Sequence, residues 1–139
     1  WSHYLDVEKT PLYPFGHGLS YTSFEYSNFT LKDSLVSIND TIKISVDVTN
    51  TGKYDGKEVV QLYIRDLVGS VTRPVRELKG FELTSLKVGE TKTINFSLQK
   101  ETLGYYNNNG DFVIEPGDYK IFIGGSSVTK LERKFTLTN

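Results

Sequence analysis

Hydrophobic and polar residues alternate along most of this chain, with the period of two that places one face of a β-strand in a core and the other in water. The alternation is clearest over residues 41–49, where every second side chain is aliphatic. The aliphatic residues there are Ile42, Ile44, Val46 and Val48. This pattern predicts a strand that is buried on one face.

The same pattern recurs and predicts a set of strands. Residues 24–31 change phase midway, which indicates a β-bulge near Ser27 and Asn28. Residues 32–40 are polar and without periodicity, so we expect a loop there. The other predicted strands are residues 58–66, 78–83, 91–98, 119–123 and 131–137. Of these, residues 78–83 have the features of an edge strand.

Turn residues separate the strands at short intervals. Asn107–Gly110 ends in Asn-Gly between aromatic-flanked arms, which predicts a β-hairpin within residues 103–113. No stretch has a convincing helical period. About seven strands with frequent turns predict an all-β fold, an immunoglobulin or fibronectin type III-like β-sandwich of antiparallel strands. Tyr119, just after Pro116–Gly117, is either a tyrosine corner or an ordinary half-buried aromatic.

Residues 1–22 differ from the rest of the chain. They are rich in aromatic residues, Pro and Gly and have no strand or helix periodicity. Aromatic side chains in an extended segment need a surface to lie against, so we predict a connector over residues 1–22 and a folded domain over residues 23–139. Tyr13, Phe15 and Tyr21 are the candidate docking residues of the connector. A disordered tail is the alternative.

Composition excludes several classes of function. The 139 residues suit a single domain, with 37% hydrophobic residues and one Trp, nine Tyr and eight Phe to form a core. The absence of Cys excludes disulfides and thiolate metal sites. A net charge of -1 argues against a nucleic-acid partner, and no apolar run is long enough to span a membrane. No signal-peptide pattern opens the sequence, so we expect the signal of an exported protein to lie upstream.

Three stretches of the chain have distinctive motifs. They are Tyr4–Val7 with Pro11–Tyr21, then Val59–Phe81 with its VQLYIRD and VTRPVRELKGF runs, then Glu115–Tyr119 with Gly124–Ser127. Together, and in this order, they resemble the C-terminal fibronectin type III-like domain of family 3 glycoside hydrolases, which include β-glucosidases and β-xylosidases. The resemblance covers nearly the whole chain, with minor departures at His17 and Val88.

The resemblance implies a non-catalytic accessory domain of an enzyme that hydrolyses terminal β-glycosidic bonds. In that family the nucleophilic Asp and the acid/base Glu belong to upstream domains, so no residue here inherits either role. We therefore expect no catalytic, metal or cofactor site in this chain. The expected partners are the upstream catalytic domains of the same polypeptide, and a homodimer is a further option. A periplasmic or extracellular location is favoured for the parent enzyme.

Basic residues gather around the long loop that follows residues 58–66. They are Arg65, Arg73, Arg76 and Lys79. Such side chains either dock on an acidic neighbouring surface or are solvated charges that protect a sheet edge. We favour docking for Arg73, which sits beside Pro74, and solvation for Lys79. If Arg76 is exposed, its removal is expected to cost under about 1 kcal/mol.

Aromatic residues and Asn sequons are the remaining candidates for chemistry. Tyr105 and Tyr106 are candidate sugar-stacking residues, and hairpin packing is the competing interpretation. Asn28, Asn39 and Asn95 each open an Asn-x-Ser/Thr sequon, which matters only in a eukaryotic secretory host.

Two functions compete with an accessory role. A carbohydrate-binding module would be favoured by an exposed coplanar aromatic pair. A free adhesion-like module would have no use for the aromatic connector, but sandwich folds of this type serve many roles.

Overall fold

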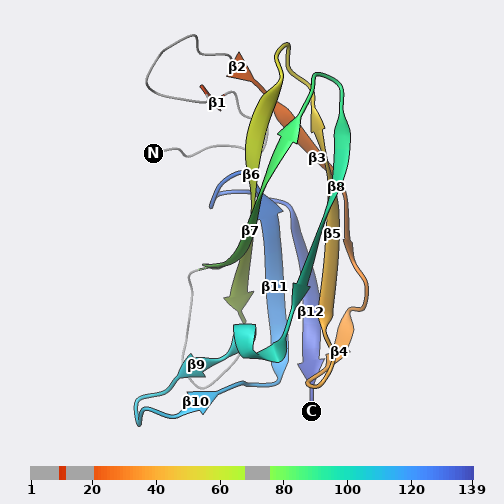
Figure 1. The fold of residues 1–139 in the computed structure, drawn as a ribbon. Coiled ribbons are helices and arrows are strands. Elements are labelled where there is room, and N and C mark those ends of the chain that lie inside the picture. The colour runs from red at the N-terminus through yellow and green to blue at the C-terminus, as the bar shows by residue number, and fades with distance from the viewer. Residues whose placement is uncertain (1–9, 12–20, 68–75) are drawn as a thin grey trace.

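The computed structural model describes residues 10–11, 21–67 and 76–139, and for residues 10, 11 and 21 it describes the backbone alone. Two β-sheets pack against each other in a sandwich (Figure 1), which confirms the predicted all-β class. The described ranges contain no helix that is long and apolar enough to cross a membrane.

The larger sheet has five strands. In spatial order they are β4 (Leu35–Ser37), β12 (Glu132–Thr138), β11 (Gly117–Gly124), β6 (Gly56–Asp66) and β7 (Glu77–Leu86). The smaller sheet has three, in the order β3 (Phe24–Leu31), β5 (Ile42–Asn50) and β8 (Thr91–Leu98). β6 and β11 are interior strands of the larger sheet, so each has a hydrogen-bonded neighbour on both sides.

Two short ribbons complete the described structure. One pairs β1 (Thr10–Pro11) with β2 (Tyr21–Thr22), and the other pairs β9 (Tyr105–Tyr106) with β10 (Phe112–Val113). A 3-10 turn at Lys100–Leu103 leads into β9. The β9–β10 ribbon is the predicted hairpin, with its turn at Asn107–Gly110, and it projects from one end of the sandwich (Figure 1).

The core follows the predicted alternation. The inward side chains of β5 are almost fully buried, and so are those of β6, β8 and β11. These residues are Ile42, Ile44, Val46 and Val48 of β5, Val60, Leu62 and Ile64 of β6, Ile94, Phe96 and Leu98 of β8, and Tyr119, Ile121 and Ile123 of β11. Mutual burial of these two apolar faces is the dominant favourable term in a fold of this kind.

Two local features of the sequence analysis are confirmed. The pairing of β3 with β5 shifts register between Ser27 and Thr30, and Asn28 at the bulge has φ 51°. Tyr119 is a tyrosine corner, because its buried hydroxyl donates a hydrogen bond to the Glu115 carbonyl oxygen at 2.5 Å. Its ring stacks on Phe135, with 5.3 Å between the ring centroids.

The predicted loop at residues 32–40 is wrong in part, because β4 lies within it. This strand pairs with β12 in parallel, whereas the other strand pairs of the described residues are antiparallel as predicted. Val36 of β4 is buried, and the Ile38 amide donates to the Thr138 carbonyl at 2.7 Å. Three residues are too few for a period of two to be visible, so the sequence held no pattern for this strand.

A buried asparagine at the end of β5 forms hydrogen bonds with four other residues. The Asn50 side-chain oxygen accepts from the Thr22 hydroxyl at 2.7 Å and from the Gly52 amide at 2.9 Å. Its amide nitrogen donates to the Tyr54 carbonyl at 2.8 Å and the Leu86 carbonyl at 3.0 Å. The side chain is 1% exposed, so loss of these bonds would leave buried polar groups without partners.

We predict that Asn50→Ala lowers the free energy of unfolding by about 3 kcal/mol, because several buried polar groups lose their partner at once. The exposed Asn108→Ala is the matched control and should change it by less than about 0.5 kcal/mol. Urea denaturation of both variants measures the difference. Equal midpoints for the two variants would mean that this buried network contributes nothing to stability.

Candidate functional site

Most of the predicted docking residues cannot be placed. Tyr13, Phe15 and Arg73 lie outside the described residues. The backbone of Tyr21 lies in β2, opposite Pro11 of β1, and its side chain is outside the description. The docking roles of these residues, and the boundary between residues 22 and 23, therefore stay predictions.

The outer face of the five-stranded sheet contains the remaining surface candidates, and strand register fixes which side chains share it. Val60, Leu62 and Ile64 point inward, so Val59, Gln61 and Tyr63 point outward. Opposite them on β7 lie Leu83, Phe81 and Leu78, respectively. Tyr63 also faces Phe122 of β11. One row of outward side chains, Leu78, Tyr63 and Phe122, therefore crosses β7, β6 and β11.

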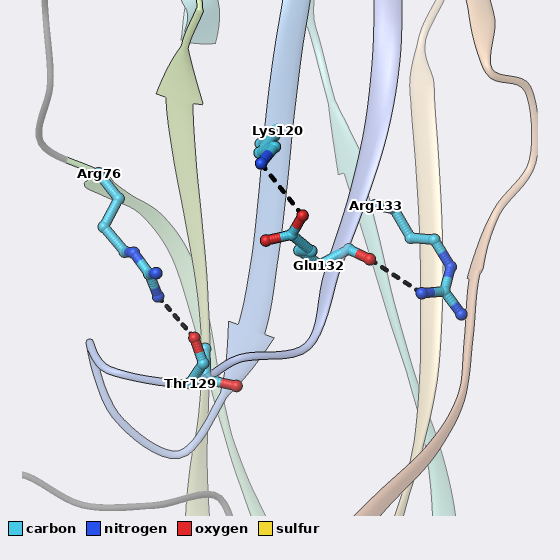
Figure 2. Close-up of polar contacts among 5 residues, drawn as sticks. All are labelled: Arg76, Lys120, Thr129, Glu132 and Arg133. Carbon is cyan, nitrogen blue, oxygen red and sulfur yellow. Dashed lines mark hydrogen bonds and ion pairs between the residues drawn. The ribbon is translucent and has the colours of Figure 1, made fainter.

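The half of this outer face on β11 and β12 is charged and internally paired. Lys120 lies 3.2 Å from Glu132 (Figure 2), and Lys134 lies 3.3 Å from Asp118. The Thr136 hydroxyl donates to Asp118 at 2.6 Å. This hydrogen bond, followed by that from Lys134, lowers the pKa of Asp118 below its ordinary value. A ladder of this kind suits a surface that faces water.

Arg76 is half-buried and not a solvated loop charge, so the exposure on which the expected small cost of its removal depends is not found. Its guanidinium lies 3.7 Å from the centroid of the Phe122 ring. Its Nη1 donates to the carbonyl oxygens of Ser127 at 3.0 Å and Thr129 at 2.7 Å, the second of which Figure 2 shows. The half-buried side chain therefore ties the start of β7 to the turn between β11 and β12 and covers an outward Phe.

The other two described basic residues of that group behave differently. Lys79 forms an ion pair with Glu77 at 3.4 Å, consistent with a surface charge at a sheet edge. Arg65 is half-buried, and its Nε is buried with no hydrogen-bond partner among the described residues.

The Tyr105 and Tyr106 side chains do not form a shared platform. Tyr105 is buried, and its hydroxyl donates to the Glu115 carboxylate. Tyr106 is exposed and meets Phe112 edge-to-face, with 5.2 Å between centroids and 62° between ring planes. The exposed pair of the hairpin is therefore Tyr106 with Phe112, and sugar stacking stays a prediction that rests on Tyr106.

A surface hollow of about 440 Å³ lies beside the turn between β7 and β8, and three of its charged side chains bond to backbone groups around that turn. The Asp55 carboxylate accepts a hydrogen bond from the Val88 amide at 2.9 Å. The Glu90 carboxylate accepts one from the Lys87 amide at 2.8 Å. The Lys92 ammonium donates to the Ser85 carbonyl at 2.7 Å. Asp55, Glu90 and Lys92 therefore have structural roles at this turn.

Two carboxylates of the sandwich, those of Asp47 and Glu58, take part in structural contacts. Asp47 accepts from Asn28 Nδ2 at 2.8 Å and from the Thr93 hydroxyl at 2.6 Å, and these two bonds lower its pKa. Glu58 accepts from the Tyr26 hydroxyl at 2.7 Å and so bridges the two sheets. Within the described ranges, no three or more His, Asp or Glu side chains lie together in a group that could hold a metal ion.

Comparison with known proteins gives a family and a position within larger proteins. Residues 58–127 match the model of the fibronectin type III-like domain. The chain is 43% identical to a periplasmic beta-glucosidase of Salmonella typhimurium over 98% of its own length and 18% of the relative. It is 49% identical to a beta-xylosidase of Formosa agariphila over 89% of its own length and 17% of the relative.

A solved structure agrees with these relatives. The crystal structure of a beta-glucosidase from Listeria innocua in complex with glucose superposes with a TM-score of 0.80 at 38% identity. The match covers 99% of this chain and 19% of that one. The chain therefore spans less than a fifth of the length of these relatives.

We predict that Arg76→Ala lowers the free energy of unfolding by about 1 to 3 kcal/mol, because the variant loses the contact with Phe122 and two hydrogen bonds. Arg76→Lys should recover only part of this, since an ammonium lacks the planar fork of a guanidinium. Chemical denaturation against the exposed control Lys43→Ala tests the prediction. An Arg76→Ala midpoint equal to that of the control would return Arg76 to a solvated role.

The lowered pKa of Asp47 predicts a pH effect of defined sign. Because the folded-state pKa lies below the ordinary 3.8, this residue stabilises the fold above that value, and the contribution is lost as pH falls through the folded pKa. Asn28→Gly, which suits the positive φ, should raise the Asp47 pKa, and Thr136→Val should raise only that of Asp118. Carboxyl NMR titration measures both. An Asp47 midpoint at or above 3.8 in the unaltered chain would contradict this account.

Proposed function

The chain belongs to the fibronectin type III-like domain family, in the form found at the C-terminus of family 3 glycoside hydrolases, and from this we propose that it is a non-catalytic accessory domain of such an enzyme. The parent enzyme hydrolyses terminal β-glycosidic bonds, with β-glucosides and β-xylosides as the substrate class. The domain acts as a structural brace for the catalytic domains of the same polypeptide.

The observation that supports this proposal most is the share of the relatives that the chain spans. A segment that makes up only 17–19% of known glycosidases leaves most of their length for the catalytic domains. Glycoside hydrolysis requires two carboxylates that flank the scissile bond, roughly 5 to 9 Å apart. Asp47, Glu58 and Asp118 are instead hydrogen-bonded within and between the sheets.

A carbohydrate-binding module has less support. Binding of a flat sugar polymer favours aromatic rings that share a plane, whereas Tyr106 and Phe112 meet at 62°. Tyr105, the other candidate, is buried. We therefore propose no second function.

We predict that the 139-residue chain hydrolyses neither a nitrophenyl β-glucoside nor a nitrophenyl β-xyloside, and that the longer polypeptide hydrolyses at least one of them. In the longer polypeptide, Asp47→Asn and Asp111→Asn should leave kcat within about twofold of the unaltered enzyme, because the proposal places both catalytic carboxylates outside this chain. Turnover by the short chain that disappears with Asp66→Asn or Asp111→Asn would overturn the proposal.

A further inference from the structure

One half of the outer face of the five-stranded sheet is apolar and exposed. Phe81 is 68% exposed, Leu83 59%, Leu78 49% and Val59 39%. Val59 lies opposite Leu83, and the row next to it joins Phe81 to Gln61. These four residues, which we call the β6–β7 apolar face, are neighbours on one surface, and soluble domains seldom leave such a group uncovered.

The polar side chains within this area are already paired. The Tyr63 hydroxyl donates to the Gln61 side-chain oxygen, and Gln61 Nε2 donates to the Gly125 carbonyl at 2.8 Å. Burial raises the pKa of Tyr63 above its ordinary value, so its hydroxyl keeps its proton. Because these groups have partners within the domain, covering them costs little in lost hydrogen bonds to water.

The β6–β7 apolar face is also held in shape. Arg76 ties the start of β7 to the turn between β11 and β12. A Cβ added at Gly80 would lie 3.4 Å from the Phe96 ring, so the middle of β7 packs closely on the inner core. The register shift between Leu62 and Tyr63 then sets which β7 side chains point outward. A surface that is ordered before binding loses little conformational entropy on contact.

We infer that the β6–β7 apolar face is a docking surface that is covered by an apolar surface of another folded domain of the same, longer polypeptide. The inference rests on the proposed function. A sheet edge that faces water is normally protected by outward charges, and the outward positions opposite Gln61 and Val59 hold Phe81 and Leu83 instead. The neighbouring ion pair of Lys79 with Glu77 is neutral overall.

The length of the relatives identifies the occupant. Each has more than four-fifths of its chain outside the matched region, so a permanent partner in the same polypeptide is available at high effective concentration. The interior of an interface between permanently joined domains is apolar and poor in charge, as this face is. A second copy of the chain is the competing occupant, and the experiment separates the two.

The test is hydroxyl-radical labelling of the longer polypeptide, with mass spectrometric readout at single residues. Phe81 and Leu83 should be labelled about tenfold less than their exposure in the domain implies, because a partner excludes water from them. Leu35, which is 66% exposed on β4, is the internal control and should be labelled fully after correction for side-chain reactivity. Labelling of Phe81 at the level its own exposure implies would overturn the inference.

Concentration dependence distinguishes the two occupants. Protection by a domain of the same polypeptide does not change on dilution. Protection by a second copy would vanish on dilution, at the concentration where light scattering shows a dimer dissociating. That result would overturn the inference in favour of a second copy. Phe81→Glu in the longer polypeptide should abolish the protection of Leu83, and Leu35→Glu should not. Hydrolysis of β-glycosides by the unaltered polypeptide is assayed in parallel, so a failed docking surface and a failed proposed function give different results.

Discussion

Mutual burial of the inner faces of two β-sheets is the interaction on which the rest of this structure depends. One core contains the inward residues of β5 and β8 together with Val60, Leu62 and Ile64 of β6. Their burial fixes which alternate residues of each strand point inward. A strand has two faces, so every alternate residue of β6 and β7 must point to the outside of the sandwich. The outward residues include Val59, Phe81 and Leu83, which are exposed and which no other described residue of the sandwich covers.

Outward side chains of the five-stranded sheet are paired or covered within the domain in two ways. On β11 and β12 it pairs them as charges, with Lys120 beside Glu132 and Lys134 beside Asp118. At Phe122 it covers an outward ring with the guanidinium of Arg76. At Val59, Phe81 and Leu83 of β6 and β7, neither kind of cover is present among the described residues, although the Tyr63 and Gln61 side chains nearby have hydrogen-bond partners. This asymmetry, more than any single residue, is the physical basis for proposing a domain that packs on a larger protein.

The sequence predicts the inner faces well because burial imposes a strict period of two. The inward residues of β5 and the bulge at Asn28 were predictable for this reason. For Tyr119 the Pro-Gly turn left a tyrosine corner and an ordinary half-buried aromatic open, and the hydrogen bond to Glu115 decides for the corner. The outward face was not predictable, because Phe81 and Leu83 alternate in the same way whether they point in or out. Only the register with β6, shifted by a bulge, decides their direction. The contacts of Arg76 and Tyr105 were not predictable for a related reason. Phe122 is distant from Arg76 in the sequence, and Glu115 lies across a hairpin from Tyr105.

The most direct measurement of the central claim is photo-crosslinking from position 81. A benzoylphenylalanine placed there in the longer polypeptide reports the residue that actually lies against the β6–β7 apolar face. The account predicts a crosslink within one chain, to a peptide outside residues 1–139, with no change in the mass of the protein on a denaturing gel. Crosslinks between two copies, or no crosslink at all, would contradict it.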